Sequence, residues 1–263
     1  MDHNDLIKEQ FDKQSATFGT MAGHYDALDL IVRLSQTTTK DNVLDVACGP
    51  GIVACAFAKI AAMVRGIDLV PAMIERAKEA QQSQGLKNMS WDIGHVNPLP
   101  YEHCSYSIVV SRFSFHHFID PQAVLEEMVR VAKWEGRVVV VDVFMNDHNQ
   151  ASAYDAMEKL RDPSHTHALL LDELNRFFEK SELTLIEKKF YRLPVDVDEL
   201  LKATLTPVKE AEEFKSIVKA DVGVNKLGIE AKIEYGKMSF SFPVVIMVGQ
   251  KSPPTNYGLS CCN

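Results

Sequence analysis

Residues 43–51 read Val-Leu-Asp-Val-Ala-Cys-Gly-Pro-Gly, and this stretch decides the fold. It begins with four residues that are apolar apart from Asp45, a pattern typical of a strand in a buried parallel sheet. Gly49 and Gly51 can adopt the backbone angles of a tight turn, and the apolar pattern of residues 52–63 then predicts a helix. Such a loop lies at the carboxyl edge of the sheet, where open α/β sheets bind ligands.

A second carboxylate follows the loop at a spacing that is common in nucleoside-binding folds. Residues 64–68 read Val-Arg-Gly-Ile-Asp, which predicts a short strand that ends in Asp68. An acid about twenty residues beyond such a loop commonly accepts hydrogen bonds from ribose hydroxyls. The two signals together indicate a cofactor that contains a nucleoside.

The charge of Asp45 discriminates between two kinds of nucleoside cofactor. Residues 49–54 read Gly-Pro-Gly-Ile-Val-Ala and also fit the loose pattern of dinucleotide-binding loops. A pyrophosphate binds to bare amides at a helix N-terminus, and a nearby carboxylate would repel it. S-adenosylmethionine (SAM) carries an ammonium and a sulfonium instead, so an acid at this edge favours SAM.

Several stretches of the chain resemble class I SAM-dependent methyltransferases. Residues 44–51, Leu-Asp-Val-Ala-Cys-Gly-Pro-Gly, resemble the first motif of these enzymes, and residues 66–77, Gly-Ile-Asp-Leu-Val-Pro-Ala-Met-Ile-Glu-Arg-Ala, resemble the second. Residues 160–165 are similar to a subset of small-molecule methyltransferases. The pattern of the ubiquinone/menaquinone C-methyltransferase-like group continues through residues 99–100, 106–112, 115–121, 126–131 and 136–142.

The resemblance implies a cofactor site built from several segments. In the family the N-terminal segment closes over the cofactor, and the residues that follow the first strands contact it. His95 stands where the family usually has an aspartate that accepts from the adenine amino group, and a neutral imidazole can also accept on one nitrogen. The implied SAM contacts are Phe11, Phe18, Asp45, Ala47, Gly49, Gly51, Asp68, Leu69, Met73, Gly94, His95, Val96 and Ser111.

Three residues after the fourth predicted strand are candidates for catalysis. Arg112, His116 and His117 stand where class I enzymes present groups to the methyl that is transferred. Adjacent side chains of an extended segment point to opposite sides, so we expect one histidine to be structural and the other to contact the substrate or act as a base. Arg161 and His165 flank an Asp-Pro-Ser turn; they either stabilise that turn with an ion pair or line the substrate pocket.

Composition restricts the function classes. The chain has 263 residues, enough for one domain with a full core, and its formal net charge of −8 argues against a nucleic-acid partner. No apolar run approaches the length of a membrane span, so we expect no membrane insertion. The five cysteines show no metal-ligand spacing, and we expect no metal. The polar, acidic start is unlike a signal peptide, which leads us to expect a cytoplasmic protein. We expect this protein to be a monomer or a homodimer.

The order of patterns predicts an α/β fold: a Rossmann-like, doubly wound, seven-stranded sheet that is mostly parallel, with an antiparallel C-terminal strand and a small helical cap. We expect one methyltransferase domain over residues 1–252 and a disordered tail over 253–263. Within the domain, residues 1–40 form a helical lid and residues 194–236 a helical insertion or cap. Residues 4–18 predict an amphipathic segment, residues 89–93 a strand and residues 148–161 a helix. Asp172 is the expected N-cap of a further helix over residues 171–180.

The resemblance implies that the chain transfers a methyl group in line from SAM to a C, O or N nucleophile of a small-molecule substrate. S-adenosylhomocysteine (SAH) is then the released product. Two alternatives stay open. The first is a protein of the same fold that binds SAM without methyl transfer, as a cyclase or in a binding role, and the second is a nicotinamide-dependent oxidoreductase.

Overall fold

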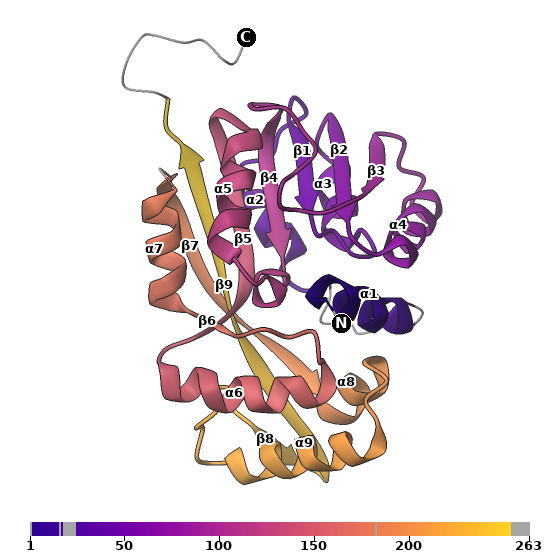
Figure 1. Ribbon diagram of the computed structural model, residues 1–263, viewed down its shortest axis with the longest axis vertical. Coiled ribbons are helices and arrows are strands. Elements are labelled where there is room, and N and C mark those ends of the chain that lie inside the picture. Colours follow the sequence, from indigo (N-terminus) through magenta and orange to yellow (C-terminus); the bar gives the residue numbers. More distant parts are fainter. Residues whose placement is uncertain (1, 16, 18–24, 182, 254–263) are drawn as a thin grey trace.

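The computed structural model describes residues 2–15, 17, 25–181 and 183–253. Its centre is a sheet whose main path has the strand order β3-β2-β1-β4-β5-β9-β7 (Figure 1). The first five of these strands are parallel, whereas β9 runs antiparallel to both β5 and β7. This confirms the predicted seven-stranded sheet. The strands are β1 (Asn42–Val46), β2 (Met63–Asp68), β3 (Met89–Ile93), β4 (Tyr106–Arg112), β5 (Ala132–Met145), β7 (Leu183–Asp196) and β9 (Lys237–Lys251).

Two short strands in the described residues were not predicted. β6 (Leu169–Leu170) pairs with the end of β5, and β8 (Lys232–Glu234) pairs with the start of β9. Segments of two and three residues are too short to show any period in the sequence. The sheet therefore has nine strands in this part of the chain, although its main path has the expected seven.

Helices cover both faces of the sheet, as a doubly wound fold requires. On one face α2 (Leu28–Leu34) and α3 (Ile52–Ala58) bury apolar side chains such as Ile31 and Phe57, which are fully buried. On the other face lie α5 (Pro121–Val131) and α7 (Leu171–Lys180). α4 (Pro71–Ser83) follows β2 and packs beside β3.

The start of α7 differs from the expected one. Leu170 is the N-cap, and the Glu173 carboxylate accepts a hydrogen bond of 2.8 Å from the Leu170 amide. The prediction of Asp172 as N-cap was wrong because the acid that satisfies the helix start lies one position later, inside the first turn.

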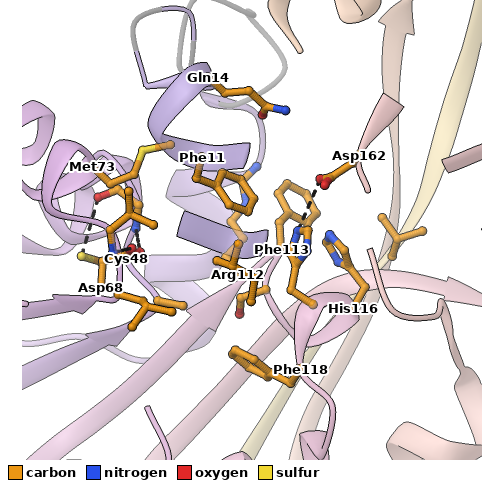
Figure 2. Close-up of a pocket in the computed structure, with 18 of the residues that line it drawn as sticks. Phe11, Gln14, Cys48, Asp68, Met73, Arg112, Phe113, His116, Phe118 and Asp162 are labelled. Atoms are coloured by element: carbon orange, nitrogen blue, oxygen red, sulfur yellow. Dashed lines mark hydrogen bonds and ion pairs between the residues drawn. The ribbon is translucent and has the colours of Figure 1, made fainter. Parts of the chain in front are cut away.

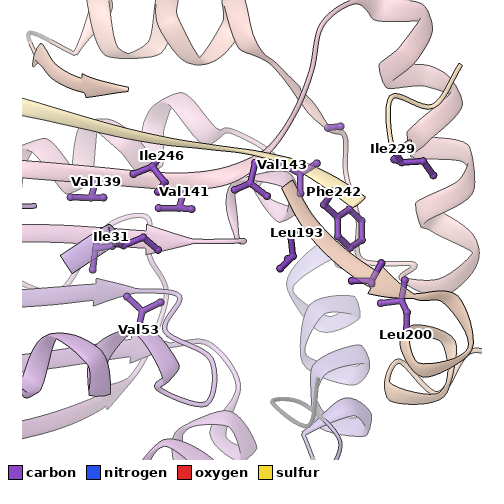
Figure 3. Close-up of a cluster of buried hydrophobic side chains, with 14 of the residues drawn as sticks. Ile31, Val53, Val139, Val141, Val143, Leu193, Leu200, Ile229, Phe242 and Ile246 are labelled. Carbon is purple, nitrogen blue, oxygen red and sulfur yellow. The ribbon is translucent and has the colours of Figure 1, made fainter. Parts of the chain in front are cut away.

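The C-terminal part of the chain forms a second layer beyond the carboxyl edge of the sheet. β5, β7 and β9 extend past the other strands, and α6 (His148–Arg161), α8 (Val197–Ala203) and α9 (Val208–Asp221) pack around their ends (Figure 1). We call this layer the cap. One continuous cluster of buried apolar side chains joins the sheet to the cap, as Figure 3 shows for Val139, Val141, Leu193, Phe242 and Ile229.

α1 (His3–Gln14) lies between the sheet and the cap (Figure 1). The Gln10 side chain donates to the Arg161 carbonyl at 3.4 Å, and the Gln14 side chain donates to the Thr204 carbonyl at 3.4 Å. α1 ends four residues earlier than the amphipathic segment expected over 4–18. Phe18 and the tail from residue 254 lie outside the described residues.

Candidate active site

A cavity of about 420 Å³ lies at the carboxyl edge of the sheet, enclosed by α1 and the cap. It has two ends (Figure 2). The loop end contains Cys48, Asp68 and Met73, and the far end contains His116, Phe118 and Asp162. Phe11 and Arg112 lie between the two ends. The order of the parallel strands explains this position, because β1 and β4 are the neighbours at which the strand order reverses.

At the loop end the Asp68 carboxylate holds the turn between β1 and α3. One oxygen accepts from the Gly49 amide at 2.8 Å, and the other accepts from the Val70 amide at 2.9 Å. Gly49 has a φ of +51°, and a Cβ atom there would meet no heavy atom within 4 Å. A side chain at this position would therefore enter open space at the cavity edge, whereas glycine leaves that space for a ligand.

Burial raises the pKa of Asp68, and the backbone amides of Val70 and Gly49 partly oppose this by favouring the ionised form. Each carboxylate oxygen has more than one acceptor direction, so Asp68 keeps the capacity to accept from a ligand hydroxyl. Apolar side chains surround it at this end. The expected cofactor residues that line the loop end are Ala47, Gly49, Asp68, Leu69, Met73, His95 and Val96.

Asp45 does not line the cavity. It lies beneath the loop, 1% exposed, and its carboxylate accepts a hydrogen bond of 2.9 Å from the Ala54 amide in the first turn of α3. Burial raises its pKa to about 8, and the nearby Asp68 charge adds to this. The structure thus corrects our expectation of a charged group that faces the cofactor, because Asp45 supports the loop from behind.

Three other expected cofactor residues also lie behind the cavity wall. Gly51 has a φ of +77°, and a Cβ there would come within 2.6 Å of the Trp91 ring, so its role is the turn itself. The Gly94 amide donates to the Asp68 carbonyl at 2.9 Å. The Ser111 hydroxyl is fully buried and donates to the Val46 carbonyl at 2.6 Å. Their side chains or backbone atoms hold the edge of the sheet and do not line the cavity.

His116 forms the most distinctive pair at the far end. Its Nδ1 lies 2.6 Å from an oxygen of Asp142, whose side chain is fully buried in β5. Three backbone amides also donate to Asp142, those of Ser114 at 3.1 Å, Phe115 at 2.8 Å and Val143 at 2.7 Å. Four donors fix this carboxylate, which fixes His116 Nδ1 as the nitrogen that faces Asp142.

The interaction between His116 and Asp142 also shifts the pKa of both side chains. Burial alone would lower the pKa of His116, but the Asp142 charge and hydrogen bond raise it above the ordinary imidazole value. Burial alone would raise the pKa of Asp142, but His116 and the backbone amides hold it below the usual value for a carboxyl. The imidazole is therefore a stronger base than a free histidine and is paired with a permanently charged carboxylate.

His117 has a different environment. Its Nδ1 lies 3.1 Å from the Ser164 carbonyl, and its Nε2 lies 3.8 Å from Asp162. Burial and the neighbouring His116, whose ring centroid is 4.3 Å away, lower the pKa of His117. Phe11 of α1 packs edge-on against this ring at 5.1 Å. His117 is thus a neutral, buried ring that joins α1 to the cap.

The reason given above for separating the two histidines was wrong. Phe115–His117 form a 3₁₀ turn, not an extended segment, so their side chains do not alternate and both line the cavity. The two side chains nevertheless differ in partners, in charge and in burial. These differences distinguish their roles.

Arg112 lies between the two ends of the cavity. It donates to the Asp26 carbonyl at 3.1 Å, and its guanidinium stacks 4.4 Å from the centroid of the Phe113 ring. Arg112 therefore joins the sheet edge to the segment before α2, and its face forms part of the cavity wall.

The cap contributes one helical face to the far end. Tyr154, Glu158 and Arg161 of α6 are spaced by four and three residues, and all three line the cavity with Asp162. Arg161 donates through Nε and a second guanidinium nitrogen to the Glu158 carboxylate. His165 does not line the cavity, and its Nε2 lies 2.7 Å from an oxygen of Asp155. Of the two expected substrate residues, the structure brings only Arg161 to the cavity.

Sequence reasoning missed Asp142, Tyr154 and Glu158. A signal existed for each of them. Asp142 is an acid within a run of valines, the same feature that singled out Asp45. Tyr154 and Glu158 precede Arg161 on one face of a helix whose limits were predicted correctly. Asp162 was noticed only as part of a turn.

Comparisons with known proteins identify the family and the fold of the chain. The family model of a methyltransferase domain matches residues 37–214. The uncharacterized methyltransferase YcgJ of Bacillus subtilis is 28% identical over 188 residues, 71% of this chain and 74% of YcgJ. Its crystal structure superimposes with a TM-score of 0.79 at 25% identity and covers 87% of this chain and 99% of that one.

Two further proteins extend the comparison. The ubiquinone/menaquinone biosynthesis C-methyltransferase UbiE of Citrifermentans bemidjiense is 26% identical over 153 residues, 52% of this chain and 65% of UbiE. A geranyl diphosphate methyltransferase in complex with SAM shares the fold, with a TM-score of 0.62 at 16% identity over 86% of this chain and 85% of that one.

The chain belongs to the methyltransferase-domain family and is a class I SAM-dependent methyltransferase. Within the described ranges, no cluster of three or more histidine, cysteine, aspartate or glutamate side chains is arranged to hold a metal ion. The same part of the chain contains no helix with the length and apolar character of a membrane span.

Proposed function

We propose that this methyltransferase acts on a small-molecule acceptor whose nucleophilic atom loses a proton to His116. The single observation that carries the proposal is the His116–Asp142 pair, because its His116 ring lines the same cavity as Gly49 and Asp68. A base and a cofactor loop in one cavity suit a transfer between two bound reactants.

The loop end suits SAM. Asp68 is the acid that would accept from the ribose hydroxyls, and Leu69 and Met73 offer apolar surface for the adenine ring. The open space beside Gly49 leaves room for a ligand at the loop. When bound, SAM supplies an electrophilic methyl group on a sulfonium.

The far end suits the acceptor. Apolar side chains from the sheet, α1 and the cap line this end and would hold a ligand close to His116. Orientation of two reactants can contribute roughly 7–11 kcal/mol to lowering the barrier. The His116 Nε2 would accept the proton of the acceptor's O–H, N–H or acidic C–H, and Asp142 would stabilise the imidazolium that forms.

Thermal unfolding with added ligands tests the cofactor. A ligand at a hundredfold its dissociation constant adds about 2.7 kcal/mol of stability, so SAM and SAH should raise the melting temperature while NADH should not. A shift with NADH and none with SAM or SAH would contradict the cofactor assignment.

A labelled methyl group tests the transfer. SAM that carries an isotopic label on its methyl group is incubated with the protein and a metabolite extract, and mass spectrometry identifies the labelled product. The expected result is labelled product with the native protein and about a hundredfold slower labelling with His116→Ala. SAM binding without any labelled product would instead indicate a protein that binds SAM in another role.

A further inference from the structure

The far end of the cavity also restricts the kind of acceptor. This inference rests on the proposed function, since it concerns the molecule that His116 would deprotonate. Its starting point is the face of α6 formed by Tyr154, Glu158 and Arg161. The His165 ring lies 6.1 Å from the Tyr154 ring and 5.5 Å from the His116 ring, so the α6 face and the base both lie near this histidine.

Two donors on this face remain available to a ligand. Arg161 uses Nε and one other nitrogen to bind Glu158, which leaves further N–H groups of its five. The Tyr154 side chain is 3% exposed and lines the cavity, and among the described residues no hydrogen bond involves its hydroxyl. This hydroxyl can therefore donate to a ligand or to water in the cavity.

Both groups stay donors at any working pH. Burial raises the pKa of Tyr154 well above the ordinary value, and the charge of Glu158 adds to this. Burial alone would lower the pKa of Arg161, but Glu158 and Asp162 raise it. Tyr154 therefore keeps its proton and Arg161 its charge.

The charges near Tyr154 and Arg161 disfavour a ligand carboxylate at this position. Arg161 is already neutralised by Glu158. Burial alone would raise the pKa of Asp162, but the Arg161 charge and the Ser164 hydrogen bond help to hold it below the usual value for a carboxyl, so Asp162 is ionised. A carboxylate placed against Tyr154 and Arg161 would meet the charges of Glu158 and Asp162 in a poorly solvated cavity. An uncharged oxygen accepts the same hydrogen bonds without this repulsion.

Most other side chains around the far end are apolar, with Gln14 and Thr204 as polar exceptions. The apolar ones suit a flat hydrophobic molecule, and they are Phe118, Leu193, Val195, Leu200 and Phe242, with Phe11 beside them.

We propose that the acceptor is an uncharged, largely apolar molecule that carries a carbonyl-type oxygen, which Tyr154 and Arg161 bind while His116 takes a proton from its nucleophilic atom. Tyr154 and Arg161 are thus specificity-determining residues. They favour a neutral oxygen over a carboxylate or an ammonium.

Four phenols that differ only in the substituent opposite the hydroxyl test this preference. 4-Hydroxyacetophenone carries a neutral carbonyl, 4-hydroxybenzoate an anion, tyramine a cation and 4-ethylphenol no polar group. Their dissociation constants are measured by ligand-observed NMR with the SAH-loaded protein and again without SAH. Millimolar constants are ordinary for ligands of this size. We expect the ketone to bind about tenfold more tightly than each of the others.

Two variants test whether Tyr154 and Arg161 cause the preference for the ketone. Tyr154→Phe removes one hydroxyl and should raise the dissociation constant of the ketone about fivefold, while that of 4-ethylphenol stays unchanged. Arg161→Lys keeps the charge beside Glu158 but removes the planar guanidinium, and it should also raise the dissociation constant of the ketone. Tyr235→Phe, at a fully exposed tyrosine, is the matched control and should change neither constant.

The outcomes separate this inference from the proposed function. The inference is wrong if 4-hydroxybenzoate or tyramine binds best, if no probe binds, or if Tyr154→Phe weakens the ketone and 4-ethylphenol equally. The SAH titration is independent of that ranking. A protein that ranks the probes as expected but does not bind SAH contradicts the proposed function alone.

Discussion

At the scale of single residues, His116 and Asp142 carry the chemistry. We predict that His116→Ala lowers kcat about a hundredfold with SAM affinity unchanged, because a positioned general base contributes about that factor. A base must be unprotonated, and the pKa of His116 is raised, so kcat/KM should rise with pH through an inflection above the ordinary imidazole value. Asp142→Asn should move that inflection to lower pH. Initial rates across a pH series measure both.

His117→Ala is the matched control for His116→Ala. His117 is neutral and held by Ser164, so its loss should lower the melting temperature and leave the pH inflection in place. If the two alanine variants show equal and small effects on kcat, catalysis depends on positioning alone and the base has to be abandoned.

Asp45 offers a second prediction at this scale. Its pKa is raised to about 8 in the folded protein, so the folded state binds more protons than the unfolded state between about pH 4 and pH 8, and stability falls as pH rises through that window. Asp45→Asn can still accept from the Ala54 amide and has no charge to bury. We predict that it stabilises the protein at about pH 9 relative to the native chain and changes little at about pH 4.

Urea unfolding at the two pH values measures this difference. SAM affinity, measured by calorimetry, should fall less than about tenfold, because Asp45 does not line the cavity. A larger fall in a folded Asp45→Asn protein would show that the carboxylate meets the cofactor directly after all.

These residues also show how far the sequence specifies the site. The spacing of Gly49 and Asp68 was sufficient to place the loop end, because both are fixed by local backbone geometry. Asp45 and Asp142 look alike in sequence, each an acid in an apolar strand. Only the structure shows that Asp142 faces a histidine while Asp45 faces a helix amide. The difference depends on which segments of the folded chain pack against each strand.

At the scale of elements, the start of α6 determines how well the cap holds its part of the site. The Asp147 carboxylate caps this helix and accepts from the amides of Asn149 and Gln150, both at 2.9 Å. We predict that Asp147→Ala costs about 1 kcal/mol of stability, as loss of an N-cap usually does. Asp147→Asn, which still accepts these bonds, should cost less. Chemical denaturation of both variants measures the difference, and equal losses would contradict the capping role.

The limits of some helices and strands were predictable from local sequence patterns. The sequence predicted α6 and β3 with their observed limits. It failed for β6 and β8, which depend on pairing with β5 and β9 and have no period of their own. The position of α1 against the cap was also invisible, because its contacts are hydrogen bonds to backbone carbonyls that no sequence pattern encodes.

At the scale of the whole molecule, the sheet and the cap share one apolar cluster and should unfold together. Phe214 of α9 is fully buried in this cluster, although α9 belongs to the cap. The two tryptophans, Trp91 in β3 and Trp134 in β5, report on the sheet. We predict that Phe214→Ala destabilises the protein by about 3–5 kcal/mol and lowers the unfolding midpoint seen by tryptophan fluorescence as much as that seen by circular dichroism.

Val208→Ala is the matched control in the same helix, because Val208 is 76% exposed and its truncation opens no cavity. If Phe214→Ala shifts only the circular dichroism signal and the tryptophan transition stays in place, the cap unfolds on its own. The acceptor end of the site would then form and dissolve independently of the cofactor loop, since Tyr154 and Arg161 lie in the cap while Gly49 and Asp68 lie in the sheet. Coincident transitions mean instead that the two ends of the cavity exist only together.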